Sequence, residues 1–199
     1  TPGVITLAPK RQTTAGGATS ATLLKTLDAS GRIAALTATA VFLRDTLAPP
    51  RSGSTFLSKL ASVTPTDIIE FDTYYLVAMG SSTAYRYTTA LSDVTPTWTT
   101  STLGADLQVA NKWAMGMAGT GANGGRLWAS INPNKVKSSS NPLNGGNWTS
   151  NYLVGSSKHN INSLSIIDDR LIVGKPEGLF WLLPAGTVQP LFSFQGAIH

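Results

Sequence analysis

The chain has 199 residues, of which 42% are hydrophobic and only 13% are charged, about half the usual charged share. Its net charge of +5 reflects a shortage of acids, and its 15 Lys and Arg residues are scattered along the sequence. Because direct nucleic-acid binding requires a basic cluster or stripe, this distribution argues against nucleic acid as a partner.

Other whole classes of protein are excluded by what the sequence lacks. There is no cysteine, which rules out a disulfide framework and cysteine-based zinc sites. No apolar run approaches the ~20 residues needed to span a bilayer, so we expect no membrane span. No stretch keeps a helical apolar period for long, whereas five Trp, six Phe and five Tyr provide the side chains of a folded core.

Residues 1–63 predict an extended N-terminal segment with possible extra strands. Residues 4–7 are consistent with a strand and residues 13–20 with a loop, while residues 21–27 fit either a helix or a strand. Residues 32–43 alternate with period two and contain Thr and Val, which favours a strand. Residues 56–63 are ambiguous.

From Asp67 onward the sequence contains three similar segments, which start near Ile68, Leu107 and Leu164. Each has an apolar strand, a turn, a second strand that ends in glycine, a third strand with aromatic residues and a short fourth strand. The turns are expected at Asp72, Asn111 and Asp168, and the glycines are Gly80, Gly116 and Gly174.

Four short strands in about 35–40 residues are typical of a β-propeller blade. The sequence therefore predicts an all-β fold with four-stranded, propeller-type blades at about residues 67–104, 105–160 and 161–199. Within the middle blade, the polar residues 132–146 are expected to form a long exposed loop. Propellers need about four to eight blades, whereas this sequence predicts about three, so we expect it to be part of a longer chain; the alternative is that copies complete the ring between them.

The region 147–182 resembles the blade pattern of β-propeller proteins in tailed-phage virions. The residues that carry this resemblance are Asn147-Trp148, Asn151-Tyr152-Leu153-Val154-Gly155, Ile161 with Leu164, and residues 171–180, and a looser likeness extends over residues 67–195. The resemblance implies a non-enzymatic structural protein of a virus particle, in a tail, a baseplate or a capsid surface, with a role in adhesion or scaffolding. It implies localisation to the virion, with an extracellular location as the alternative. The implied partners are other virion proteins and copies of the chain itself in a symmetric assembly, with a host-surface glycan as a further candidate.

No catalytic, cofactor-binding or metal-binding residues are predicted. His159 and His199 are isolated, Asp168-Asp169 is interpreted as a β-turn, and residues 119–125 are interpreted as a hairpin loop because no phosphate-loop Lys follows them. A propeller hydrolase is the least favoured alternative. It would require acids gathered at the ring centre from a set of Asp67, Asp72, Asp106 and Asp168.

The five tryptophans lie in predicted strands, so most should be buried between blades. The alternative function is a carbohydrate-binding propeller, which would instead expose some of these rings on a loop face. The five residues are Trp98, Trp113, Trp128, Trp148 and Trp181.

Overall fold

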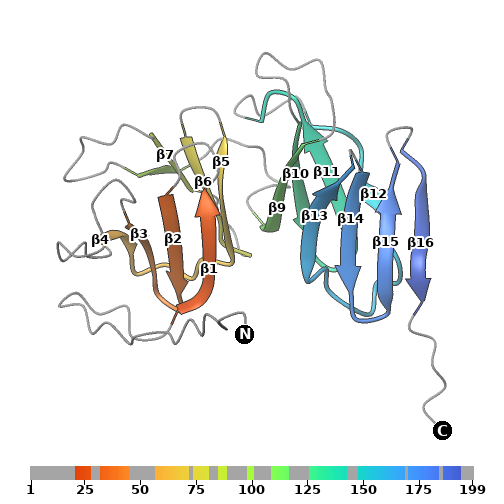
Figure 1. Cartoon of the computed structure of the whole chain (residues 1–199), viewed down its shortest axis with the longest axis horizontal. Helices are drawn as coiled ribbons and strands as arrows, with labels where there is room; N and C mark the ends of the chain where they lie inside the picture. Colours follow the sequence, from red (N-terminus) through yellow and green to blue (C-terminus); the bar gives the residue numbers. More distant parts are fainter. Residues whose placement is uncertain are drawn as a thin grey trace, which may run out of the picture.

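In the computed structural model, all regular structure in the described residues is β-strand. Four antiparallel sheets of four strands each follow one another along the chain, and we call them blades 1 to 4 (Figure 1). The chain therefore has the all-β fold with propeller-type blades that the sequence predicts. The structure describes residues 21–27, 32–44, 57–71, 74–80, 85–88, 98–100, 109–116, 126–142, 148–168, 170–183 and 186–193.

Blade 1 lies within the segment for which only possible strands were expected, and it raises the number of blades from three to four. Its strands are β1 (Ala21–Leu27), β2 (Arg32–Thr37), β3 (Ala40–Arg44) and β4 (Leu57–Ala61). The alternating stretch 32–43 is not one strand but a hairpin. The Thr37 hydroxyl stabilises its turn by accepting a bond from the Thr39 N–H and donating one to the Ala40 carbonyl.

Blades 2 and 4 have the strand order that the sequence pattern predicts. Blade 2 consists of β5 (Asp67–Phe71), β6 (Tyr74–Ala78), β7 (Tyr85–Thr88) and β8 (Thr99–Thr100). Blade 4 consists of β13 (Ser163–Ile167), β14 (Arg170–Lys175), β15 (Gly178–Leu182) and β16 (Val188–Ser193). Gly80 adopts φ +62° and Asp168 adopts φ +48°, the left-handed conformations that end strands in turns.

Blade 3 corrects two of the sequence-based expectations. Its strands are β9 (Ala110–Gly116), β10 (Arg126–Ile131), β11 (Lys135–Ser139) and β12 (Tyr152–Leu153). Asn111 lies inside β9 rather than in a turn, so the predicted strands of this copy are displaced by one. The polar stretch 132–146 is not simply a loop, because it contains β11.

The serines of β11 show why a polar sequence can form a buried strand. Val136 and Ser138 are two residues apart, so both side chains point to the same face of the strand, and both are buried. The Ser138 hydroxyl accepts a hydrogen bond from the Arg126 guanidinium at 3.2 Å, and the Ser138 N–H donates to the Thr149 hydroxyl at 3.0 Å. These bonds satisfy polar groups that would otherwise be costly to bury.

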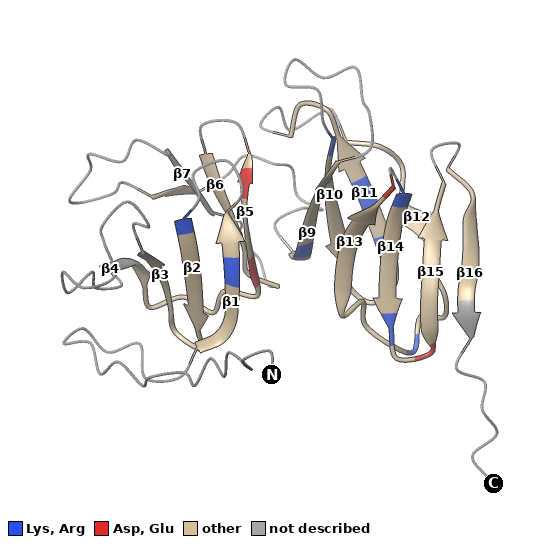
Figure 2. Cartoon of the chain, in the orientation of Figure 1, with Lys and Arg blue, Asp and Glu red and all other residues tan. Residues whose placement is uncertain are grey.

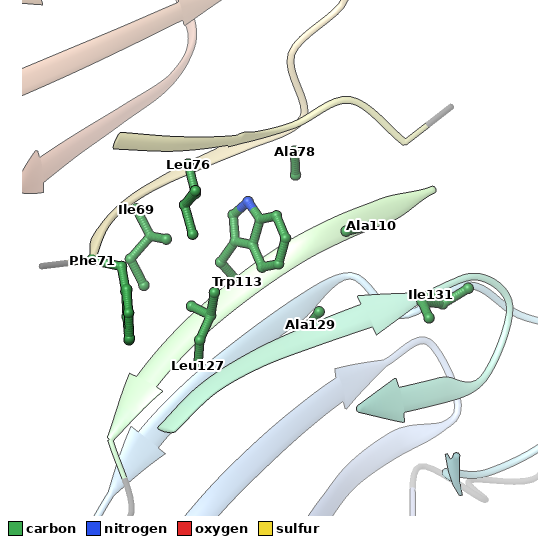
Figure 3. Packing of buried hydrophobic residues seen from close by; sticks show 9 residues of the cluster. All are labelled: Ile69, Phe71, Leu76, Ala78, Ala110, Trp113, Leu127, Ala129 and Ile131. Carbon is green, nitrogen blue, oxygen red and sulfur yellow. The ribbon is translucent and has the colours of Figure 1, made fainter. Parts of the chain in front are cut away.

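Three hydrophobic clusters join consecutive blades. One joins blades 1 and 2 and includes Leu36 and Tyr75, and another joins blades 3 and 4 and includes Trp128 and Leu171. The cluster between blades 2 and 3 surrounds Trp113, whose indole lies among Ile69, Leu76, Ala78 and Leu127 (Figure 3). No cluster of described residues joins blade 4 to blade 1, and in Figure 1 an opening separates β1 from β13. As far as the described residues show, the four blades therefore form an open arc.

Candidate functional site

The first strand of each blade lines a shared central cavity of about 340 Å³. Its walls are residues 25–27 of β1, 69–70 of β5, 113–114 of β9 and 164–166 of β13. This arrangement is typical of propellers, in which the innermost strands surround an axial channel. Among the described lining residues, Glu70 is the single acid and Lys25 the single base.

The Lys25 ammonium is held by a neighbouring carboxylate, that of Asp67 at the start of β5. Lys25 Nζ lies 3.0 Å from Asp67 Oδ1, which also accepts a bond from the Ile68 N–H at 2.8 Å. Asp67 Oδ2 accepts a hydrogen bond from the backbone N–H of Trp113, also at 2.8 Å. One buried carboxylate of blade 2 thus bonds to both neighbouring blades, and its charge is neutralised where it is buried.

A second set of polar contacts joins blades 2, 3 and 4. The Thr66 hydroxyl donates to the Asn111 carbonyl at 2.9 Å, and Lys112 Nζ donates to the Thr66 carbonyl at 2.9 Å. The Asn111 side chain donates to the Ile161 carbonyl of the segment that leads into blade 4, at 3.3 Å. Asn111 therefore connects neighbouring blades through hydrogen bonds. The sequence did not indicate this role, because it predicted a turn at Asn111.

A buried lysine occupies the junction of blades 3 and 4. Lys175 Nζ, fully buried, donates to the Val154 carbonyl at 2.9 Å and to the Ser156 carbonyl, and it lies 3.2 Å from Glu177 Oε1. The Ser156 N–H donates to the same carboxylate oxygen at 2.8 Å. These bonds fix the β14–β15 turn of blade 4 to the segment after β12 of blade 3.

The charges and hydrogen bonds of this junction shift the pKa of the Glu177 carboxyl. Burial raises the pKa of the Glu177 carboxyl, but the hydrogen bond from the Ser156 N–H and the adjacent Lys175 ammonium lower it by more. The net result is a pKa below the ordinary value for glutamate. Glu177 is consequently ionised at neutral pH and contributes to the junction as a carboxylate.

The outward face of blade 4 has no neighbouring blade among the described residues. It presents a hollow of about 230 Å³ lined mainly by apolar side chains, and the Arg170 guanidinium lies 4.5 Å from the centre of the Trp181 ring. The hollow is bounded by Ile167, Asp168, Arg170, Ile172, Leu179, Trp181 and Leu191.

The candidate catalytic and metal-binding residues do not converge on one place within the described part of the chain. Asp168 lies in the β13–β14 turn, as interpreted, and His159 lies in an exposed loop, whereas Asp67 lies between blades. Among the described residues, no group of three His, Asp or Glu side chains could hold a metal ion. Asp72, Asp106, Asp169, His199 and residues 119–125 lie outside the described residues.

The aromatic residues follow the predicted burial in part. Trp113 and Trp128 are buried between blades, and Trp98 and Trp148 are partly buried against two of the clusters. Trp181 is only half-buried, on the outward face of blade 4. The sequence missed Lys175 and Asp67 because nothing in their local pattern marks a charged residue that a neighbouring blade will cover.

The basic side chains do not gather into one field. Figure 2 shows Lys and Arg on several strands of blades 1, 3 and 4, in agreement with their scattered sequence positions. The described part of the chain carries no continuous basic stripe. No helix among the described residues has the length and apolarity needed to cross a bilayer.

Comparison with known proteins relates the chain to solved propeller structures. No protein-family model matches, and no curated protein sequence matches significantly. The chain is similar to the computationally designed Ika4 protein, with a TM-score of 0.54, 12% identity and coverage of 90% of this chain and 94% of that one. It is similar to the AfRom2 CNH domain, with a TM-score of 0.57, 14% identity and coverage of 87% and 55%. The designed Ika8 protein matches with a TM-score of 0.51 and 12% identity, over 83% of this chain and 46% of that one.

The chain thus spans nearly all of one solved propeller-like chain and about half of two others. At these identities the likeness shows the fold alone. It establishes the class of the protein as an all-β, propeller-type domain.

Proposed function

We propose that this chain is a non-enzymatic structural module of a virus particle, in a phage tail or on a capsid surface, where its blades form a rigid mount for contacts with other subunits. The observation that carries the proposal is the use of charged side chains between blades. Asp67, Lys112 and Lys175 each bond across a blade junction. Such bonds favour a fixed relative position of the blades over a reactive centre.

The chemistry of the central cavity also supports a non-catalytic role. Glycosidases need two carboxyl groups that flank the scissile bond. Glu70 is the one acid among the described residues that line the cavity, and the Asp67 carboxylate accepts bonds from Lys25, Ile68 and Trp113.

The placement in a virion is supported by the sequence resemblance in residues 147–182. These residues cover the end of blade 3, the Lys175 junction and the first three strands of blade 4. The resemblance therefore covers the hydrogen-bonded junction of blades 3 and 4 and most of blade 4, whose outward face has no neighbouring blade among the described residues.

Sedimentation of native particles tests this placement. Material from the natural source is separated on a density gradient, and fractions are probed with antibodies raised against the purified chain. We expect the protein to band with particles and to remain there after a high-salt wash, and immunogold labelling should then locate it on the tail or the capsid. Recovery with soluble proteins at the top of the gradient would overturn the virion assignment.

A Glu70→Gln variant tests the non-enzymatic part. If the protein has a structural role, particles that incorporate the variant should keep the infectivity of the wild type. Normal particle assembly with lost infectivity would point to chemistry in the central cavity instead.

A further inference from the structure

We infer that the outward face of blade 4 is an interface for blade 1 of a second copy, so that two arcs of four blades close into one eight-bladed ring. This inference concerns the purified chain and does not depend on placement in a virion. The two ends of the arc differ from the three junctions inside it.

Each junction inside the arc has the same construction. One face of a blade packs on the opposite face of the next blade, and a hydrophobic cluster fills the space between them. The outward face of blade 4 corresponds to the faces of blades 1, 2 and 3 that pack against the next blade along the chain. A propeller blade is therefore the occupant that this face is built to receive.

The apolar content of the face fits that occupant. Ile167 is 57% exposed although it lies on the innermost strand, where β5 in the middle of the arc is buried throughout. The hollow between Ile167, Ile172 and Trp181 measures about 230 Å³. A cavity of about 150 Å³ accommodates benzene, so this hollow has room for a branched aliphatic side chain.

Blade 1 carries the matching side chain at the other end of the arc. Leu24 on β1 is 64% exposed, and it pairs with Ala35, which in turn pairs with Phe42 on the face turned away from blade 2. Ala35 and Phe42 are already buried, so the open part of this face is the strip along β1. Thr22 and Thr26 flank Leu24 there, so no charge in this strip opposes Arg170 of blade 4.

The geometry of closure favours a second copy over other occupants. A contact between different faces of identical chains is heterologous, and it closes into a ring when the rotation completes a full turn. Two four-bladed arcs give eight blades, which lies within the range of closed propellers.

The first test is the mass of the chain in solution, measured by light scattering and sedimentation over a range of concentrations. We expect a dimer of about 42 kDa, twice the 20.9 kDa of one chain. Leu24→Asp and Ile167→Asp should each weaken the dimer at least about 100-fold, since each places a charge in both joints of the ring. Leu153→Asp is the matched control, because Leu153 is 61% exposed but lies on β12, away from both ends of the arc.

A monomer at all concentrations, or a dimer that both end variants leave unchanged, would overturn the inference. Weakening by Ile167→Asp alone would overturn it too, because it would indicate that two copies of blade 4 meet face to face. Circular dichroism and thermal unfolding of each variant establish that the blades are intact.

Single cysteines define the joint directly, since the chain has no cysteine of its own. Leu24→Cys and Ile167→Cys chains are mixed and oxidised. A disulfide-linked dimer should form in the mixture and not in either variant alone. Equal cross-linking within one variant, or none in the mixture, would contradict a joint between blade 4 and blade 1 of another copy.

Discussion

Strands β5 and β13 occupy the same place in their blades but differ in what covers them. β5 has the sequence DIIEF and is buried at every residue, including Asp67 and Glu70. β13 has the sequence SLSII and alternates between exposed and half-buried residues. The more polar strand is the more deeply buried one, because β5 has a blade on both sides and β13 has a described blade on one side. Position in the arc therefore decides burial more than hydrophobicity does.

The largest expected effect lies at the doubly covered junction. Trp113→Ala removes an indole that is 2% exposed from the cluster between blades 2 and 3. It should lower the free energy of unfolding by about 3–5 kcal/mol, measured by urea denaturation. Trp181→Ala on the outward face of blade 4 is the control under conditions where the chain is monomeric, and the contrast between the covered junction and the outward face would fail if both substitutions cost the same.

A smaller effect is expected from the charged connector in β5. Asp67→Ala leaves the buried N–H groups of Trp113 and Ile68 without an acceptor and should cost about 2–4 kcal/mol. Asp67→Asn keeps an acceptor oxygen and should cost less. A double-mutant cycle with Lys25→Met separates the ion pair from the backbone bonds. Equal costs for both Asp67 substitutions would show that charge alone matters.

The junction of blades 3 and 4 should respond to acid. Because the folded-state pKa of Glu177 is lowered, its contribution is fully present above the unfolded-state pKa of about 4.3 and is lost as pH falls through the lower folded-state value. Unfolding free energy measured from pH 7 to pH 3 should fall less steeply for Glu177→Gln than for wild type. Identical acid profiles would contradict a stabilising carboxylate at this site.

The smallest effect on the single chain is expected at the open end. Ile167→Ser should change stability by less than about 0.5 kcal/mol under conditions where the chain is monomeric. Ile69→Ser in buried β5 should cost several times more, because it loses packing and buries a hydroxyl. Similar losses at both positions, measured by denaturant unfolding, would show that Ile167 is covered in the monomer.

The sequence predicted the blade architecture correctly where turn-forming residues clearly separate the strands. In blade 4, turns at Asp168 and after Lys175 separate apolar strands, and the structure places them there. In blade 3 the same reasoning placed a turn at Asn111, because an asparagine in a strand interior is unusual and resembles turn chemistry. Its amide bonds to the Ile161 carbonyl in the segment before blade 4, and no local pattern shows a partner 50 residues away.

The strands of blade 1 were predicted only as possible strands, for a related reason. Its buried positions include Ala34, Ala35 and Ala40, whose small side chains give a weak periodic signal. The connecting residues of the candidate site were hidden in the same way, since Asp67 and Lys175 are ordinary charged residues until neighbouring blades enclose them. What the sequence lacks in these cases is the identity of the neighbour.

The bonds of Asp67 to blades 1 and 3 imply an order in which the arc loosens. Among the described residues, blade 2 is held by two junctions and shares one carboxylate with both, while blade 4 is held by one junction, to blade 3. In a linear array of this kind the end units open at lower free energy than the middle ones. Amide hydrogens of β14 and β15 should therefore exchange with solvent before those of β5 and β6. Closing the ring would remove the ends and slow that exchange throughout.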